Sequence, residues 1–215
     1  LNAGKTPGLG LSVKFKLANK LVYSKLKPKL GLGNARICVS GAAPIAPEIL
    51  EFFSGFDVVI REVYGQSEDC GPTTFNIPGK TKFGSVGALI PGIDVKIADD
   101  GEILVKGPNV FMGYFKDKKA TEGTLSDGWL YSGDLGAFDD QGFLTITGRK
   151  KEIIITAGGK NLSPEKIENA LKMSTFIKEV IAIGDRRKFI GALVQIDYPA
   201  VSDWASRRNL SHTSF

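Results

Sequence analysis

The sequence has almost no histidine, since His212 is the single one among its 215 residues. Histidine-based catalytic triads and multi-histidine metal sites are therefore excluded within this chain. The two cysteines, Cys38 and Cys70, are too few for a disulfide-rich scaffold or a four-cysteine zinc site. Each lies beside apolar or small residues, which favours buried free thiols and a reducing compartment.

Long apolar runs are also missing. No stretch approaches the roughly 20 residues of a membrane span, and we identify no secretory signal. The chain begins with Leu1 instead of Met, which raises the expectation that it is a piece of a longer protein. Glycine and proline are abundant, at 26 and 10 residues, and this favours a loop-rich fold with tight turns.

Acidic residues are absent before Glu48, so the formal net charge of +5 is a property of the first 36 residues. Residues 11–30 are predicted to form an amphipathic helix that carries lysines and ends at Pro28. Its expected apolar stripe contains Leu11, Phe15, Ala18, Val22 and Leu26. Two interpretations stay open: a solvated helix packed through this stripe, or peripheral contact with an anionic membrane surface. Nucleic-acid binding is disfavoured, because the positive charge is confined to one short segment in which aromatic residues do not alternate with the basic ones.

The next segment has the order of elements that is typical of a parallel α/β sheet. We predict a buried strand over residues 35–40, a small-residue loop over 41–44, a helix over 47–53 and a second strand over 58–60. In such sheets, ligands bind at the loops that leave the carboxyl ends of the strands.

From Gly84 the pattern changes to short antiparallel strands around turns. The expected strands are residues 93–97, 103–105, 111–115, 135–138 and 143–147. This spacing favours a small barrel or a curled sheet. Beyond Lys150 we expect a strand over 152–156, a helix that Ser163 caps and Pro164 begins, and an antiparallel pair over 180–183 and 190–196.

Four clusters could carry chemistry, although each alone could also be an ordinary turn or cap, and residues 40–44 are more typical of a plain tight turn. The small residues 40–44 would let a flat ligand approach the backbone. In residues 64–68, a ring could stack on a base, a hydroxyl could donate to a phosphate and a carboxylate could hold Mg²⁺. Within residues 131–136, Asp134 could accept hydrogen bonds from two ribose hydroxyls. The charged joint at 148–161 would suit a hinge.

In combination, these clusters resemble the adenylate-forming acyl-CoA synthetases, the superfamily that also holds firefly luciferase and nonribosomal peptide adenylation domains. Residues 133–136, 139–142 and 146–161 are most similar to bacterial long-chain fatty acid ligases. The resemblance extends from about Ala35 to the end of the chain.

The resemblance implies an α/β fold in several parts. It implies the late part of a large parallel-sheet α/β domain (1–83), a small antiparallel β-barrel-like subdomain (84–148), a hinge (149–152) and a truncated α+β C-terminal domain (153–215). It also implies an ATP-dependent, AMP-forming reaction. A fatty acid and Mg·ATP give an acyl-adenylate and pyrophosphate, and coenzyme A then displaces AMP. The small C-terminal domain rotates about the hinge between the two steps.

The resemblance also assigns roles to residues. Gly41, Ala42 and Ala43 line the adenine site, Tyr64 packs on the base, and Gly65 and Gln66 border the acyl pocket beside the nucleotide. Ser67 faces the phosphates and Glu68 binds Mg²⁺. Asp134 and Arg149 bind the ribose, and Lys151 lies at the hinge. Gly158, Gly159 and Lys160 belong to the tunnel for the pantetheine of coenzyme A. Either Gly158 or Gly159 could correspond to the glycine that other members of the family have in this loop.

Two family features are missing from this chain: the upstream phosphate-binding loop and the C-terminal lysine that stabilises adenylate formation. We therefore expect the 215-residue chain to be an inactive piece of a cytoplasmic fatty acyl-CoA ligase, with contact at the inner membrane face as an open question. The alternatives are an adenylation enzyme that loads a carrier protein and a nonenzymatic module that binds nucleotide or a lipid surface. Acyl chain length and oligomeric state cannot be read from the residues.

Overall fold

The computed structural model describes residues 8–211, so His212 lies outside the described part. The chain divides into two compact units, Leu1–Thr147 and Gly148–Phe215, and each is described by itself. None of the helices within residues 8–211 combines the length and the apolar character that crossing a membrane requires.

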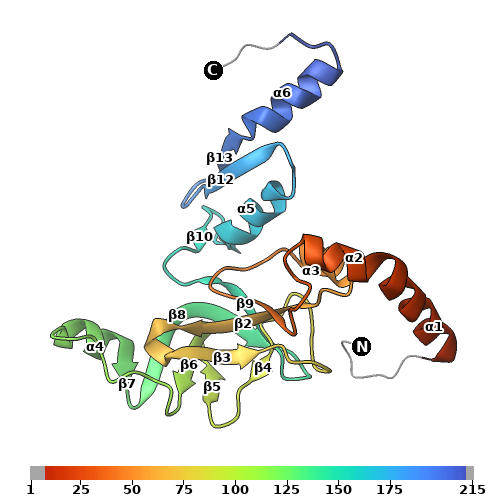
Figure 1. Ribbon diagram of the computed structural model, residues 1–215. Coiled ribbons are helices and arrows are strands. Elements are labelled where there is room, and N and C mark those ends of the chain that lie inside the picture. The colour runs from red at the N-terminus through yellow and green to blue at the C-terminus, as the bar shows by residue number, and fades with distance from the viewer. Residues whose placement is uncertain (1–7, 212–215) are drawn as a thin grey trace. The chain divides into compact units, whose positions relative to one another are not determined.

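The first described segment is helical, as the sequence predicts. Helix α1 (Leu9–Ala18) continues through a π-helical turn (Asn19–Tyr23) into α2 (Ser24–Lys29) (Figure 1). Pro28 lies inside α2 and does not end it, since the helix continues to Lys29. The chain then turns at Gly31, whose φ is 74°.

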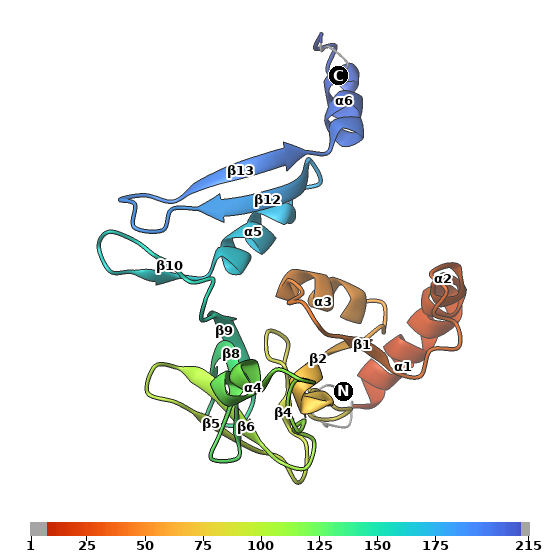
Figure 2. The same cartoon turned by 90° about the vertical axis from the view of Figure 1, so that its left-hand side faces the viewer.

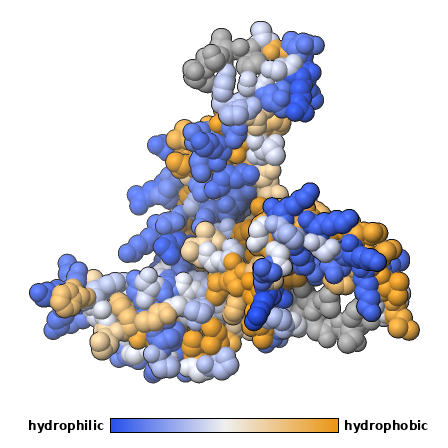
Figure 3. All heavy atoms as spheres, viewed as in Figure 1, coloured by the Kyte–Doolittle hydropathy of each residue, from blue (hydrophilic) through white to orange (hydrophobic). Residues whose placement is uncertain are grey.

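The predicted apolar stripe of this segment is not buried. No residue of α1 is buried, and Leu9 is 90% exposed. Leu11, Val13 and Leu17 are exposed as well. Of the predicted stripe, Leu11, Phe15 and Val22 are 62%, 36% and 48% exposed. Residues two positions apart point about 200° apart around a helix, so Val13 and Leu17 point away from this stripe, and the apolar side chains are not confined to one side. Apolar and charged residues accordingly lie next to one another over this segment (Figure 3).

The first sheet has the strand order β1-β2-β3-β4. Strands β1 (Cys38–Ser40) and β2 (Ile60–Gln66) are parallel, and α3 (Pro47–Ser54) connects them. This confirms the predicted parallel pair, although β1 is shorter than predicted and β2 begins only at Ile60 and extends to Gln66. The first strand was predicted to be buried, which is wrong, since Val39 is 50% exposed. The prediction of buried thiols is also wrong, because Cys38 is half-buried and Cys70 is exposed. A 3₁₀ turn, η2 (Ser67–Asp69), leads into β3 (Gly71–Phe75), which pairs antiparallel with β2 and β4 (Ala88–Leu89).

The second sheet of this unit is antiparallel and open. Its order is β5-β6-β8-β7, and β9 pairs with β8. Its elements are β5 (Asp94–Ile97), β6 (Glu102–Lys106), α4 (Lys118–Thr124), β7 (Leu125–Ser126), β8 (Trp129–Phe138) and β9 (Leu144–Arg149). The predicted hairpins are confirmed, but the pairings within residues 8–211 do not close a barrel.

The strand predicted over residues 111–115 is wrong. This segment is irregular, because Gly113 has a φ of 136° and Lys116 a φ of 56°. In addition, the Phe111 N–H donates to the Glu68 carbonyl oxygen at 2.8 Å and not to a neighbouring strand of the second sheet. The apolar run Val110–Phe111 instead packs against the core.

One core joins the two sheets of the first unit. Its buried residues are Tyr64, Ile103, Val105, Leu130 and Leu144. Fully burying an aliphatic side chain of this size stabilises a fold by about 1.5–3 kcal/mol. Tyr64 of the first sheet is therefore fixed against strands of the second.

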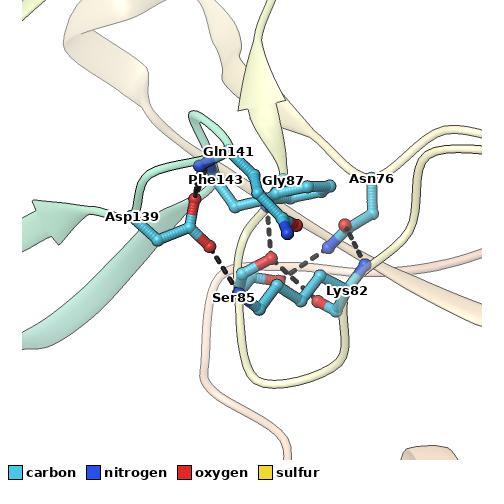
Figure 4. Close-up of polar contacts among 7 residues, drawn as sticks. All are labelled: Asn76, Lys82, Ser85, Gly87, Asp139, Gln141 and Phe143. Atoms are coloured by element: carbon cyan, nitrogen blue, oxygen red, sulfur yellow. Dashed lines mark hydrogen bonds and ion pairs between the residues drawn. The ribbon is translucent and has the colours of Figure 1, made fainter.

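A polar network also ties the loop before β4 to the turn before β9 (Figure 4). The Lys82 ammonium lies 2.6 Å from Oδ2 of Asp139, whose Oδ1 accepts the N–H groups of Gln141 and Phe143 at 2.9 Å each. Asn76 donates to the Ser85 carbonyl oxygen at 2.6 Å and accepts the Lys82 N–H at 3.0 Å.

Up to residue 211, the second unit contains two hairpins and two helices. Strands β10 (Ile154–Ile155) and β11 (Asn161–Leu162) form a short hairpin, so the strand predicted over 152–156 is shorter than expected. Helix α5 (Pro164–Lys172) follows Ser163, as predicted. The Ser163 side chain makes no hydrogen bond to the helix, so the prediction that it caps α5 is wrong in this respect.

The predicted antiparallel pair is confirmed as β12 (Ile177–Ile183) and β13 (Gly191–Ile196), which precede α6 (Tyr198–Arg207). Helix α5 lies along this hairpin (Figure 2), and Glu168 of α5 accepts the Ala182 N–H at 2.8 Å. Val180 and Ala182 are buried, whereas Ile181 is exposed, which is the alternation that the sequence shows.

Candidate functional site

The centre of the candidate site is the carboxylate of Asp134, which is 5% exposed in the middle of β8. The Tyr64 hydroxyl donates to Oδ2 of Asp134 at 2.9 Å, and Nε2 of Gln66 donates to the same oxygen at 2.6 Å. Gln66 also donates to the Ser132 carbonyl oxygen at 2.9 Å. The sequence places these residues 70 positions apart, and the structure brings them together because β2 and β8 share the core.

The electrostatics of this cluster keep the phenol protonated. Burial and, next, the negative charge of Asp134 raise the pKa of Tyr64, so its hydroxyl remains a donor at neutral pH. The hydrogen bonds from Tyr64 and Gln66 fix the orientation of this buried carboxylate. Such a group can accept hydrogen bonds from the hydroxyls of a ligand.

The backbone around Asp134 depends on a residue that sequence reasoning missed. Gly133 has a φ of 72°, and its N–H donates to Oε1 of the buried Glu102 at 2.9 Å. The Asp134 N–H donates to the Ser132 hydroxyl at 3.1 Å. Glu102 gave no signal in the sequence, because it belongs to a hairpin 31 residues away.

The small-residue loop over Gly41, Ala42 and Ala43 follows β1 and is exposed. Ser40 pairs with Glu62, so the loop begins next to Val63 at the end of the parallel pair. A Cβ at Gly41 would lie 2.7 Å from Cγ1 of Val63, which only glycine avoids. Ala42 has a φ of 68°, which is rare for a residue with a side chain.

The turn after β2 holds Ser67 and Glu68, and Asp69 fixes it. Asp69 is 1% exposed; its carboxylate accepts the Gln66 N–H and the Thr73 hydroxyl, each at 2.6 Å. Burial raises the pKa of Asp69, while these hydrogen bonds oppose the shift. A Cβ at Gly65 would come within 1.8 Å of the Gly71 carbonyl oxygen, so the strand needs glycine there. Asp69 is a second residue that sequence reasoning missed.

Glu68 is contacted from a distant segment. The Tyr114 hydroxyl donates to Oε1 of Glu68 at 2.6 Å, and this hydrogen bond is the main cause that raises the pKa of Tyr114. The half-buried Glu68 does not belong to a ready-made metal cluster, since residues 8–211 contain no group of three or more histidine, cysteine or acidic side chains able to hold an ion.

The remaining candidates belong to the second unit. Arg149 ends β9, and its carbonyl oxygen accepts the N–H groups of Glu152 and Ile153 at 2.9 and 3.1 Å. Lys151 lies in this same exposed turn.

Gly158, Gly159 and Lys160 form the exposed turn of the β10–β11 hairpin, where Gly159 has a φ of 77°. The Gly159 N–H donates to the Thr156 carbonyl oxygen at 2.8 Å, and the Lys160 N–H donates to the Thr156 hydroxyl at 3.1 Å. Of the two glycines, only Gly159 therefore occupies a conformation that disfavours a side chain.

Two family models match this chain. A model described as AMP-binding enzyme matches residues 14–115, and a model described as AMP-binding enzyme C-terminal domain matches residues 151–211. Together the two matches cover more than half of the chain, and they leave the Asp134 region between them.

Curated relatives agree with these models. The chain is 46% identical over 203 residues to the long-chain-fatty-acid–CoA ligase FadD15 of Mycobacterium tuberculosis (strain ATCC 25618 / H37Rv), covering 94% of this chain and 34% of that protein. It is 42% identical over 200 residues to the long-chain-fatty-acid–CoA ligase ACSBG2 of Xenopus laevis, covering 90% of this chain and 27% of that protein. The chain thus spans about a third of the length of the curated relatives it matches.

Solved structures give the same fold. The O-succinylbenzoate coenzyme A synthetase (MenE) of Bacillus subtilis in complex with AMP matches with a TM-score of 0.68 and 30% identity, over 82% of this chain and 40% of that one. The same enzyme in complex with ATP and a magnesium ion matches with a TM-score of 0.68 and 30% identity, over 80% of this chain and 40% of that one.

Proposed function

This chain belongs to the AMP-binding enzyme family, and from that premise we propose that the complete protein is an ATP-dependent, AMP-forming fatty acyl-CoA ligase. The resemblance of the chain to this family is thereby confirmed. The observation that carries the proposal is the buried Asp134 carboxylate, which Tyr64 and Gln66 orient at the junction of the two sheets. The names of the curated relatives support a long-chain fatty acid as the substrate.

The proposed reaction has two steps. A carboxylate oxygen of the acid forms a bond to the α-phosphorus of ATP, and the bond to the bridging oxygen breaks, which releases pyrophosphate. The coenzyme A sulfur then bonds to the acyl carbon, and AMP leaves as the C–O bond breaks. The first step transfers the adenylyl group to the carboxylate, and the second transfers the acyl group to the sulfur, whose thiol proton is released to the solvent. Positioning and charge stabilisation supply most of the acceleration in such transfers.

Nucleotide binding is the role we propose for the first unit. Asp134 accepts hydrogen bonds from the ribose hydroxyls, a role for which its fixed orientation is suited. The Tyr64 ring and the exposed loop over 41–43 contact the base, and Gly65 and Gln66 border the acyl group. Ser67 faces the phosphates. For Arg149, at the end of β9, we likewise propose a role in binding the ribose.

Glu68 fits the binding of Mg²⁺ as a single carboxylate at a turn. Magnesium is commonly held by one or two carboxylates together with substrate phosphates, so a three-residue cluster is not required. When bound with ATP, the ion neutralises charge on the phosphate oxygens. Glu68 contributes one ligand and a negative charge at the position where the β2 strand ends.

The second unit is the part we propose to move and to meet coenzyme A. The hinge would comprise residues 149–152 with Lys151, and the division between the units at Thr147 and Gly148 supports this place. Residues 158–160 would line the pantetheine tunnel. On this view residues 1–83 are the late part of a large domain, 84–148 a subdomain built on the antiparallel sheet, and 153–215 the start of the C-terminal domain.

The test of this proposal is a product analysis. With a long-chain fatty acid, Mg·ATP and coenzyme A, the complete protein should form AMP and consume free thiol in equal amounts. AMP formation without thiol consumption would favour the alternative, an enzyme that loads a carrier protein. We expect the isolated 215-residue chain to bind nucleotide weakly and to show no turnover. Tight AMP binding by this chain alone would favour the nonenzymatic nucleotide-binding module.

A lipid surface is a second candidate partner, because α1 exposes Leu11 and Leu17 next to Lys14 and Lys16. Such a segment can bind anionic membranes from the cytoplasmic side, and the two free cysteines suit that compartment. Sedimentation with anionic vesicles tests this membrane contact, and the absence of binding would refute it.

A further inference from the structure

One loop of the first unit is attached to the turn that carries Glu68. The loop, residues 109–114, reaches η2 through three hydrogen bonds. Nδ2 of Asn109 donates to the Asp69 carbonyl oxygen at 3.1 Å, and the Phe111 N–H donates to the Glu68 carbonyl oxygen at 2.8 Å. The Tyr114 hydroxyl donates to Oε1 of Glu68 at 2.6 Å. Two contacts fix the backbone of the turn, and the third fixes the side chain of Glu68.

Tyr114 is itself held in place. Its N–H donates to Oγ1 of Thr121 at 2.9 Å. The Thr121 hydroxyl in turn donates to the Asp117 carbonyl oxygen at 2.8 Å. The Phe111 ring packs edge-on against the Tyr114 ring, with centroids 5.0 Å apart. The close approach of Gly113 to Thr121 leaves no room for a side chain, since a Cβ there would lie 2.5 Å from Cγ2 of Thr121. Thr121 of α4 thus fixes the backbone of Tyr114, and Phe111 packs against its ring.

We propose that Tyr114 is a positioning residue for Glu68, holding its carboxylate in the rotamer that binds Mg·ATP. The inference rests on the proposed function, because it requires that Glu68 binds the metal. A hydrogen bond from a neutral phenol fixes one carboxylate oxygen without cancelling the negative charge. A lysine or arginine at the same place would also fix it, but would compete with the cation for that charge.

A purely structural role is the competing explanation, and it makes a different prediction. Tyr114 is 38% exposed, so the loss of its hydroxyl should cost little stability. If the hydroxyl only tied the loop down, the thermal stability would change and the response to Mg²⁺ would not. If it positions Glu68, the response to Mg²⁺ changes and the thermal stability stays nearly constant.

The test compares Tyr114→Phe with the wild type in the complete protein. We expect the Mg²⁺ concentration for half-maximal ATP–pyrophosphate exchange to rise by roughly tenfold or more, which is the lower end of the effect of losing one hydrogen bond to a charged group. The affinity for ATP measured in the presence of EDTA should stay within twofold. Tyr23→Phe is the matched control, because it removes the same atom from a residue in the helical segment before α2.

A second background separates the two roles. In a Glu68→Gln protein, Tyr114→Phe should change the Mg²⁺ response by less than twofold, since the charged partner is already gone. An equal Mg²⁺ response of Tyr114→Phe and wild type would overturn the inference, and so would an undiminished effect in the Glu68→Gln background.

Failure of the proposed function is distinguishable from failure of this inference. Wild-type protein that binds Mg·ATP but shows no acid-dependent exchange would refute the ligase function, while the comparison of Mg·ATP affinities would still decide the role of Tyr114. Wild-type protein that binds no ATP would overturn both.

Discussion

The hydrogen bond from Tyr64 to Asp134 gives a quantitative test of the candidate site. Tyr64→Phe keeps the ring that packs against Ile103 and Leu130, so it opens no cavity in the core. It removes the hydrogen bond from the Tyr64 hydroxyl to Oδ2 of Asp134 and leaves the one from Gln66. Hydrogen bonds to charged groups contribute about 1.5–3 kcal/mol each, so we expect a loss of about 2 kcal/mol in the free energy of unfolding.

Urea unfolding followed by tryptophan fluorescence measures this loss. Trp129 reports on the first unit, and a Trp204→Phe background removes the signal of the second. The midpoint should fall while the slope stays unchanged. Tyr131→Phe is the matched control, since Tyr131 lies on the same strand but is 41% exposed, and its loss should stay within about 0.5 kcal/mol.

A double-mutant cycle refines the prediction. In an Asp134→Ala background the buried phenol loses its partner, so Tyr64→Phe should there be neutral or stabilising. A Tyr64→Phe protein as stable as the Tyr131→Phe control would refute the reasoning. An equal loss in both backgrounds would show that the phenol acts elsewhere.

Three further predictions follow from particular contacts. Gly65→Ala should cost about 3 kcal/mol of stability, because its Cβ would overlap the Gly71 carbonyl oxygen. Gly123→Ala is the control: it lies inside α4 with open space around it, so it should stabilise the protein by up to about 1 kcal/mol. Similar unfolding midpoints for the two variants would contradict this reasoning. The Lys82 ammonium and then the Phe143 N–H lower the pKa of Asp139, so its contribution is present above the unfolded-state pKa of about 4 and is lost as the pH falls through the native value. The difference in Tm between wild type and Asp139→Asn should therefore be constant near pH 7 and vanish in strong acid, and a difference that persists at low pH would refute the ion pair as its source. In the complete protein, Asp134→Ala should raise the KM for ATP about tenfold or more through lost hydrogen bonds to ribose, and an unchanged KM would refute that role.

Local patterns were sufficient to predict several elements of the fold. The alternating residues of β12 and β13 and the turn of the β5–β6 hairpin follow directly from the periodicity of the sequence. The parallel pair β1–β2 with α3 between its strands was also predictable. These elements depend on contacts between near neighbours, which a single sequence records.

Contacts between distant segments account for the errors. Residues 111–115 have the composition of a strand, but Phe111 and Tyr114 contact Glu68, more than 40 positions earlier. The same applies to Glu102, whose carboxylate accepts the Gly133 N–H, and to the ion pair between Lys82 and Asp139. No periodicity encodes such pairs, because they depend on how the two sheets pack.

In the candidate site, too, some residues were predictable from local motifs and others depend on contacts with distant segments. Asp134 and Tyr64 stand out in the sequence as members of motifs, and the structure brings their side chains into contact. Asp69 was passed over although it is more deeply buried than either, since a carboxylate in a short turn looks like a solvated residue. Its burial is visible only once Gln66 and Thr73 surround it.

The central claim is that the complete protein activates a fatty acid as its adenylate, and isotope exchange measures this most directly. With labelled pyrophosphate, ATP and Mg²⁺ but no coenzyme A, label should enter ATP only when a long-chain fatty acid is present, and Asp134→Ala should reduce the rate. The absence of exchange, or exchange that proceeds equally without the acid, would contradict the account.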